Sequence, residues 1–151
     1  MYETLLYLHS WLRWLVLLAA GVAFVRAVMA LQSKRAWEPL DRKVQLGFVL
    51  GLDLQAALGL GLYLVSPLTQ FANLKSSMKV AALRFFAVEH VFVMVLALAV
   101  VHILSAKSKR STDGVKKLRL WSWGVVVGVL LLLAAIPWPG LAHGRMLFRL
   151  P

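Results

Sequence analysis

The sequence predicts an all-α integral membrane protein, an up-down bundle of four transmembrane helices that forms a single domain over residues 1–151. Three observations support this fold class. Hydrophobic residues make up 61% of the chain and the mean hydropathy is +0.78, whereas charged residues contribute 15% against roughly 25% in soluble domains. Four apolar runs each reach the roughly 20 helical residues that cross a bilayer. The loops between them are short, so that consecutive helices become antiparallel neighbours.

Four runs are the expected transmembrane helices: residues 5–31, 44–66, 80–105 and 119–138. Pro67 and the run Pro137-Trp138-Pro139 mark the ends of two of them, because proline cannot donate the helical hydrogen bond. Gly47 and Gly51 form a G-x-x-x-G pattern, which predicts that the second helix packs in the middle of the bundle. The fourth helix has no polar residue in its apolar stretch, and we expect much of its surface to face lipid.

Basic residues predict the orientation of the chain. The first and third loops contain four and six of them, whereas the second loop and the C-terminal tail contain two each. These residues are Lys34, Arg35, Arg42 and Lys43; Lys107, Lys109, Arg110, Lys116, Lys117 and Arg119; Lys75 and Lys79; Arg145 and Arg149. The positive-inside rule therefore places the two basic loops in the cytoplasm and both termini outside. The net charge of +11 follows from this distribution, and we expect no nucleic-acid partner.

Composition also limits the chemistry. Without cysteine, the chain forms no disulfide, iron–sulfur cluster or thiolate metal site. It contains no phosphate-binding glycine loop, nucleophile elbow or H-E-x-x-H motif. We therefore expect a protein without catalytic activity of its own.

Ionisable residues within the predicted helices are the candidate functional residues. Asp53, Glu89 and His90 lie about 14 to 15 Å from the starts of their helices, near the bilayer midplane, and Arg13 lies at a similar depth. Ionisable groups inside a membrane turn away from lipid and pair with one another. We expect these four residues to meet in one buried polar cluster, which either serves a function or only fixes the packing of the helices.

His9 and His90 form a candidate ligand pair for the iron of one b-type haem, which needs two imidazoles on opposite sides of its ring. Their helices, the first and the third, are diagonal partners in an up-down bundle. Arg13 or Arg84 would meet the propionates, and Glu89 would orient an imidazole. The estimated depths of His9 and His90 differ by roughly 6 to 9 Å, a gap that tilt or an earlier start of the first helix would close. Three phenylalanines are the expected walls of the slot: Phe85, Phe86 and Phe92.

Three alternatives remain open at this point. A copper site would use His90 and Met94, one turn apart on the same helix. A proton path would run through Asp53, Glu89 and His90. A haem-free accessory subunit would use the polar cluster for packing or docking. Three further ionisable residues are expected to lie outside any site, as a snorkelling arginine, an interfacial histidine and a solvated histidine: Arg26, His102 and His143.

Five short motifs span most of the chain: Leu8-His9-Ser10, Leu12-Arg13-Trp14, Arg84-Phe85, Glu89-His90 and Pro137-Trp138-Pro139. Through them the sequence resembles a family of small four-helix bacterial membrane proteins that carry the label "cytochrome B". The resemblance implies that five positions are the ones to test: His9, Arg13, Arg84, Glu89 and His90. We therefore expect an electron carrier or redox-complex subunit of the bacterial cytoplasmic (inner) membrane. Its expected cofactor is one haem b, and its expected partners are the lipid bilayer and other membrane protein subunits.

Overall fold

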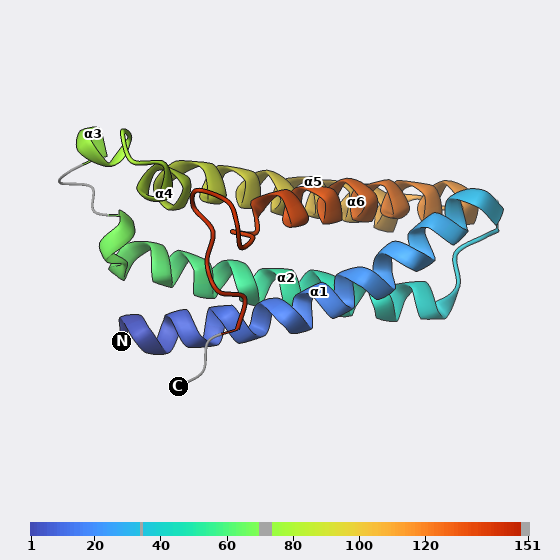
Figure 1. The fold of residues 1–151 in the computed structure, drawn as a ribbon. Coiled ribbons are helices and arrows are strands. Elements are labelled where there is room, and N and C mark those ends of the chain that lie inside the picture. The colour runs from blue at the N-terminus through green and yellow to red at the C-terminus, as the bar shows by residue number, and fades with distance from the viewer. Residues whose placement is uncertain (34, 70–73, 149–151) are drawn as a thin grey trace.

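The computed structural model describes residues 1–33, 35–69 and 74–148, so Lys34 and Arg149 lie outside the described residues. Within these ranges the secondary structure is entirely helical (Figure 1). Four helices are long and apolar enough to cross a membrane: Tyr2–Ser33 (α1), Pro39–Val65 (α2), Ala81–Arg110 and Gly114–Ala135 (α6). The predicted four-helix membrane fold is confirmed, and the chain is a multi-pass membrane protein.

The third spanning helix is composite. It joins α4 (Ala81–Arg84), a π-helical turn (Phe85–Glu89) and α5 (His90–Arg110). A 3₁₀ turn (Pro67–Thr69) and the short helix α3 (Leu74–Ser77) lie between α2 and α4. All four spanning helices extend beyond the predicted ranges at one end or both, because hydropathy locates only their apolar middle parts.

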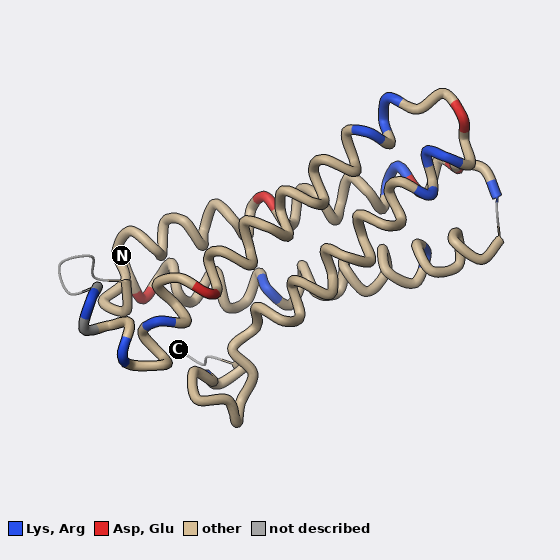
Figure 2. The backbone as a smooth tube through the Cα atoms, turned by 90° about the horizontal axis from the view of Figure 1, so that it is seen from above, with Lys and Arg blue, Asp and Glu red and all other residues tan. Residues whose placement is uncertain are grey.

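The four helices run up and down, and the tail that follows α6 (residues 136–148) lies toward the same end of the bundle as the start of α1 (Figure 1). α1 packs on α2 and α6, α5 packs closely on α6, and α2 and α5 form the weakest of these four helix pairs, whereas α1 and α5 barely touch. α1 is therefore diagonal to α5, as the sequence predicts. We call the end with the start of α1 and residues 136–148 the tail end, and the end with residues 35–43 and 107–119 the basic end. Most lysines and arginines lie at these two ends, and few lie between them (Figure 2).

α6 is the most buried of the four helices, although large apolar side chains such as Trp123 and Leu130 remain exposed on its outer face, as expected. Half of its most apolar 18-residue window is buried, against 17% for α2. Glycine explains the difference, because a β-carbon at Gly128 would lie 2.4 Å from a methyl carbon of Val101 on α5. A β-carbon at Gly47 on α2 would meet nothing within 4 Å. The closest helix packing is therefore between α5 and α6, and α2 does not occupy the middle of the bundle.

The hydrophobic core fills the half of the bundle toward the basic end. Its large members include Phe48, Leu52, Val101 and Trp121. Trp121 is 1% exposed and packs edge-on against Trp37 of the first loop, with ring centres 5.8 Å apart. This tryptophan anchors the loop to the core and does not belong to an interfacial belt.

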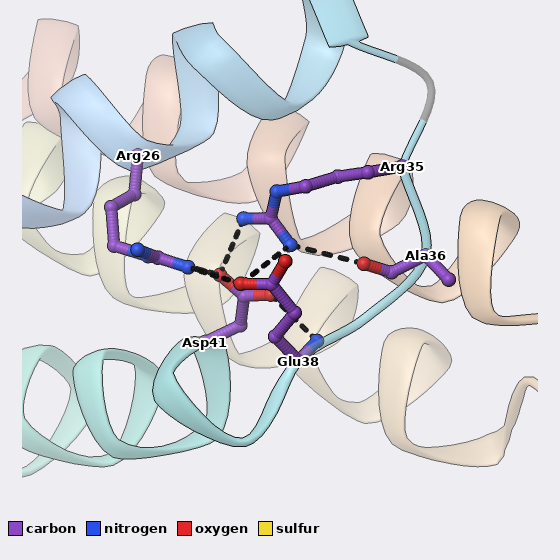
Figure 3. A network of polar contacts seen from close by, with 5 residues as sticks. All are labelled: Arg26, Arg35, Ala36, Glu38 and Asp41. Atoms are coloured by element: carbon purple, nitrogen blue, oxygen red, sulfur yellow. Dashed lines mark hydrogen bonds and ion pairs between the residues drawn. The ribbon is translucent and has the colours of Figure 1, made fainter.

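A network of charged side chains closes the first loop at the basic end (Figure 3). The fully buried carboxylate of Asp41 accepts hydrogen bonds from Arg26 and Arg35, each at 2.7 Å. Glu38 lies 3.3 Å from Arg26, and its backbone N–H donates to Asp41 at 2.9 Å. The hydrogen bonds that Arg35 donates to Asp41 raise the pKa of Arg35 above its ordinary value, so this guanidinium stays charged. Arg26 is thus an ion-pair partner that joins α1 to α2, and the expectation of a snorkelling side chain is wrong.

Substitution of Gly128 by alanine is predicted to lower stability by about 1 to 3 kcal/mol, because the added methyl group forces α5 and α6 apart. The matched variant Gly47→Ala adds the same methyl group in open space and is expected to unfold at or slightly above the wild-type temperature. Thermal unfolding in detergent, followed by circular dichroism, compares the two. Equal effects would contradict the assigned packing.

Asp41→Asn is predicted to cost about 3 kcal/mol, because it leaves two guanidinium groups without the buried carboxylate between them. Glu38→Gln removes an exposed acid from the same network and is expected to cost less than about 1 kcal/mol. The same unfolding measurement tests this order. A larger loss for Glu38→Gln would mean that Asp41 is not the centre of the network.

Candidate functional site

A cavity of about 140 Å³ lies in the tail-end half of the bundle. His9 of α1 and His90 of α5 line it and face each other, with ring centres 6.5 Å apart and ring planes at 77°. α1 begins at Tyr2, earlier than predicted, which favours the level placement of the two rings despite their estimated difference in depth. Apolar side chains form most of the remaining wall, among them Leu6, Val16, Leu62, Met94 and Leu132.

The ring of His90 is oriented by a backbone carbonyl of α6. Its Nδ1 lies 2.8 Å from the carbonyl oxygen of Ala135, which can only accept. Nδ1 therefore donates, and in the neutral ring Nε2 keeps its lone pair. The helical donor to Ala135 would be the N–H of residue 139, which is proline. Pro139 thus leaves this carbonyl free for His90, an arrangement typical of histidines that bind metals.

His9 is positioned by α2. The side-chain amide of Gln55 donates to the backbone carbonyl of His9 at 3.0 Å and lies 3.3 Å from its Nε2. The Nδ1 of His9 is buried and has no hydrogen-bond partner among the described residues. Gly59 makes room for the ring, because a β-carbon there would lie 3.2 Å from Cε1 of His9. A buried ring nitrogen with an unused bonding capacity therefore lies at the cavity.

The C-terminal tail covers the cavity. Arg13, which lines the cavity, donates a hydrogen bond to the carbonyl oxygen of Leu147 in the tail. The rings of Trp14 and Phe148 stack beside it, with centres 4.8 Å apart and planes at 7°. Arg145 of the tail lines the cavity as well. Two guanidinium groups therefore lie at the wall formed by α1 and the tail.

Arg84 and Glu89 are not among the residues that line the cavity. They pair with each other, at 2.6 Å between Nε and Oε1, and both side chains are half-exposed. The π-helical turn Phe85–Glu89 brings residues five apart onto one face, so Glu89 meets Arg84 and does not orient an imidazole. Phe86 lines the cavity, whereas Phe92 is 67% exposed and is not a wall.

Asp53 pairs with His102 and not with Glu89. The distance between Oδ1 and Nε2 is 2.7 Å, and the side chains are 42% and 45% exposed. This pair joins α2 to α5, the weakest of the four packed helix pairs. The structure therefore separates the four residues expected to form one cluster. Arg13 and His90 line the cavity, while the two acids are bound by nearer partners outside it.

Several polar residues of the cavity wall were not predicted, and three of them make defined contacts: Gln55, Tyr63 and Arg145. Arg145 lies 5.1 Å above the ring of Phe86. The hydroxyl of Tyr63 donates to the carbonyl of Ala87 in the π-helical turn at 3.0 Å. Residues 55, 59 and 63 are spaced four apart, which places them on one face of a helix, and this spacing is the signal that would have found two of the three.

Comparison of the chain with known proteins gives no match to a family model, to a curated protein or to a solved structure. Among the described residues, no group of three or more histidine, cysteine, aspartate or glutamate side chains could hold a metal ion.

The neutral ring of His90 is predicted to carry its proton on Nδ1. Nitrogen-15 NMR of histidine-labelled, cofactor-free protein in detergent distinguishes the two tautomers, and the signal lost in His90→Ala gives the assignment. His143, which lies in the tail, provides a reference. A proton on Nε2 would contradict the hydrogen bond to Ala135.

Proposed function

We propose that the protein is a small membrane electron carrier, or the corresponding subunit of a redox complex, that binds one b-type haem between His9 and His90. The observation that carries this proposal is the pair of imidazoles that face each other across an apolar cavity from diagonal helices. Two metal–imidazole bonds of about 2 Å each imply ring centres about 6 Å apart, and the observed separation is 6.5 Å.

The free nitrogen of His90 supports the same assignment, because Nε2 keeps its lone pair while Nδ1 donates to Ala135. Nε2 of His9 lies 3.3 Å from the side-chain amide nitrogen of Gln55, which can only donate. The neutral ring of His9 then carries its proton on Nδ1, and its contact with Gln55 would have to break before Nε2 could bind a metal. A bare metal ion needs three or more protein ligands in most sites, whereas haem brings four nitrogens of its own and needs only these two. Met94 lines the cavity, but a copper site would rely on a single thioether beside the two rings.

The charged residues, the apolar wall and the volume of the cavity determine how the chain would hold the haem. Arg13 and Arg145 are the residues that would pair with carboxylates of the cofactor, and the apolar wall would exclude water. Haem supplies the one-electron chemistry. The cavity of about 140 Å³ is smaller than the roughly 300 to 1,000 Å³ typical of ligand pockets, so binding requires the tail or the weakly packed α2 and α5 to move outward.

The proposal includes a location in the bacterial cytoplasmic membrane, with both termini in the periplasm and other membrane protein subunits as partners. The excess of basic residues at one end of the bundle supports this orientation. The cavity would then open toward the periplasmic side. The small volume of the cavity favours a second candidate function, a haem-free accessory subunit in which the two histidines only pack the helices.

The purified protein is predicted to show a bis-histidine b-type spectrum on reduction with dithionite, with one haem per chain. His9→Ala and His90→Ala are each expected to abolish this spectrum, because haem binding would need both axial ligands. His102→Ala removes an imidazole from α5 outside the cavity and is expected to leave the spectrum unchanged. A folded protein that shows no such spectrum, even after titration with added haem, would favour the accessory subunit.

A further inference from the structure

We propose that a second cavity, at the basic end, binds the phosphate headgroup of an anionic phospholipid. This cavity of about 320 Å³ lies where α5 ends and α6 begins. Five residues line it: Lys107, Arg110, Ser111, Lys116 and Leu120. The proposal is independent of the haem, because it concerns the opposite end of the bundle.

The connection between α5 and α6 builds this cavity. The hydroxyl of Ser108 donates to the carbonyl of Lys117 at 2.8 Å, which holds the last turn of α5 beside the first turn of α6. The carboxylate of Asp113 caps α6, where it accepts from the backbone N–H of Val115 at 2.8 Å and of Lys116 at 3.2 Å. Asp113, the acidic residue nearest in sequence to these cations, is therefore bound to the backbone at the start of α6.

In the part of the chain that the structure describes, the cations of the cavity form no ion pair. Among the described residues, none of Lys107, Arg110 and Lys116 has an acidic partner within ion-pair distance. Lys117 differs, because its ammonium group lies 5.1 Å above the ring of Trp37. Three unpaired cations around one cavity repel one another, and a bound phosphate would relieve this repulsion through charge-assisted hydrogen bonds. The hydroxyl of Ser111 donates to the backbone carbonyl of Asp113 at 3.2 Å, so the three cations are the groups that would bind the phosphate.

The position of the cavity favours a lipid over free phosphate. Leu120 lies one helical turn from Lys116, farther along α6 into the membrane-spanning segment. An amphiphile can place its phosphate among the cations and its acyl chain against this leucine, whereas inorganic phosphate gains nothing from it. Basic pockets between transmembrane helices bind anionic headgroups in this way. Basic loops alone are explained by topology, but topology does not require three cations around a cavity with an apolar floor.

The test is a native mass spectrometry titration of the intact protein in detergent with phosphatidylglycerol, phosphatidylcholine and inorganic phosphate. We expect tighter binding of phosphatidylglycerol than of phosphatidylcholine. Each basic residue near an anionic headgroup contributes roughly a fivefold factor, so Lys107→Gln/Arg110→Gln/Lys116→Gln should weaken phosphatidylglycerol binding on the order of a hundredfold. The matched variant Arg42→Gln/Lys43→Gln/Lys109→Gln removes the same charge from the basic end, outside the cavity, and should leave binding unchanged.

The variant Leu120→Ser distinguishes binding of a phospholipid headgroup from binding of inorganic phosphate. It should weaken phosphatidylglycerol binding without a change in the binding of inorganic phosphate. Three results would each overturn the proposal. The first is an equal loss of binding in the two triple variants, and the second is equal binding of the two lipids. The third is displacement of phosphatidylglycerol by inorganic phosphate together with no effect of Leu120→Ser. Circular dichroism verifies folding, and Lys107→Gln and Lys116→Gln as single variants replace the triple variant if it does not fold.

Discussion

In hydrocarbon, a backbone carbonyl without a donor costs several kcal/mol, because no water is present to replace the missing hydrogen bond. Every helix end leaves carbonyls without helical donors, and in the last turn of α6 the run Pro137-Trp138-Pro139 lacks two N–H groups as well. The indole of Trp138 donates to the carbonyl of Leu133 at 2.9 Å, and His90 donates to that of Ala135. The helix end and the orientation of the histidine thus depend on the same two prolines.

The two halves of the bundle interior differ in packing. Toward the basic end, the glycines of α6 allow close packing, the core is filled with apolar side chains, and the buried carboxylate of Asp41 ties the first loop to α1. Toward the tail end, the helices leave a cavity and place polar groups around it.

The number of helices, their up-down order and the diagonal relation of His9 and His90 followed from hydropathy, loop length and spacing. The burial of α6 did not, because lipid-facing and core-facing side chains are both apolar and hydropathy does not separate them. The partners of Asp53 and Glu89 depend on how each helix is rotated about its own axis. A shift of one residue along a helix changes the direction of a side chain by about 100°, and hydropathy does not fix the rotation that closely. The parallel stacking of His143 on Phe85, at 3.7 Å between ring centres, depends on the path of the tail after the prolines, which sequence patterns do not specify.

A π-helical turn is equivalent to the insertion of one residue into an α-helix. Each α-helical residue advances the direction of the side chain by about 100°, so the turn Phe85–Glu89 sets the angle between everything before it and everything after it. A chain one residue shorter here would regain a regular helix and keep its four spans, yet it would turn His90 away from His9. In the evolution of such a bundle, a single codon in this segment would therefore be enough to gain or lose the facing pair of histidines without any substitution in the cavity.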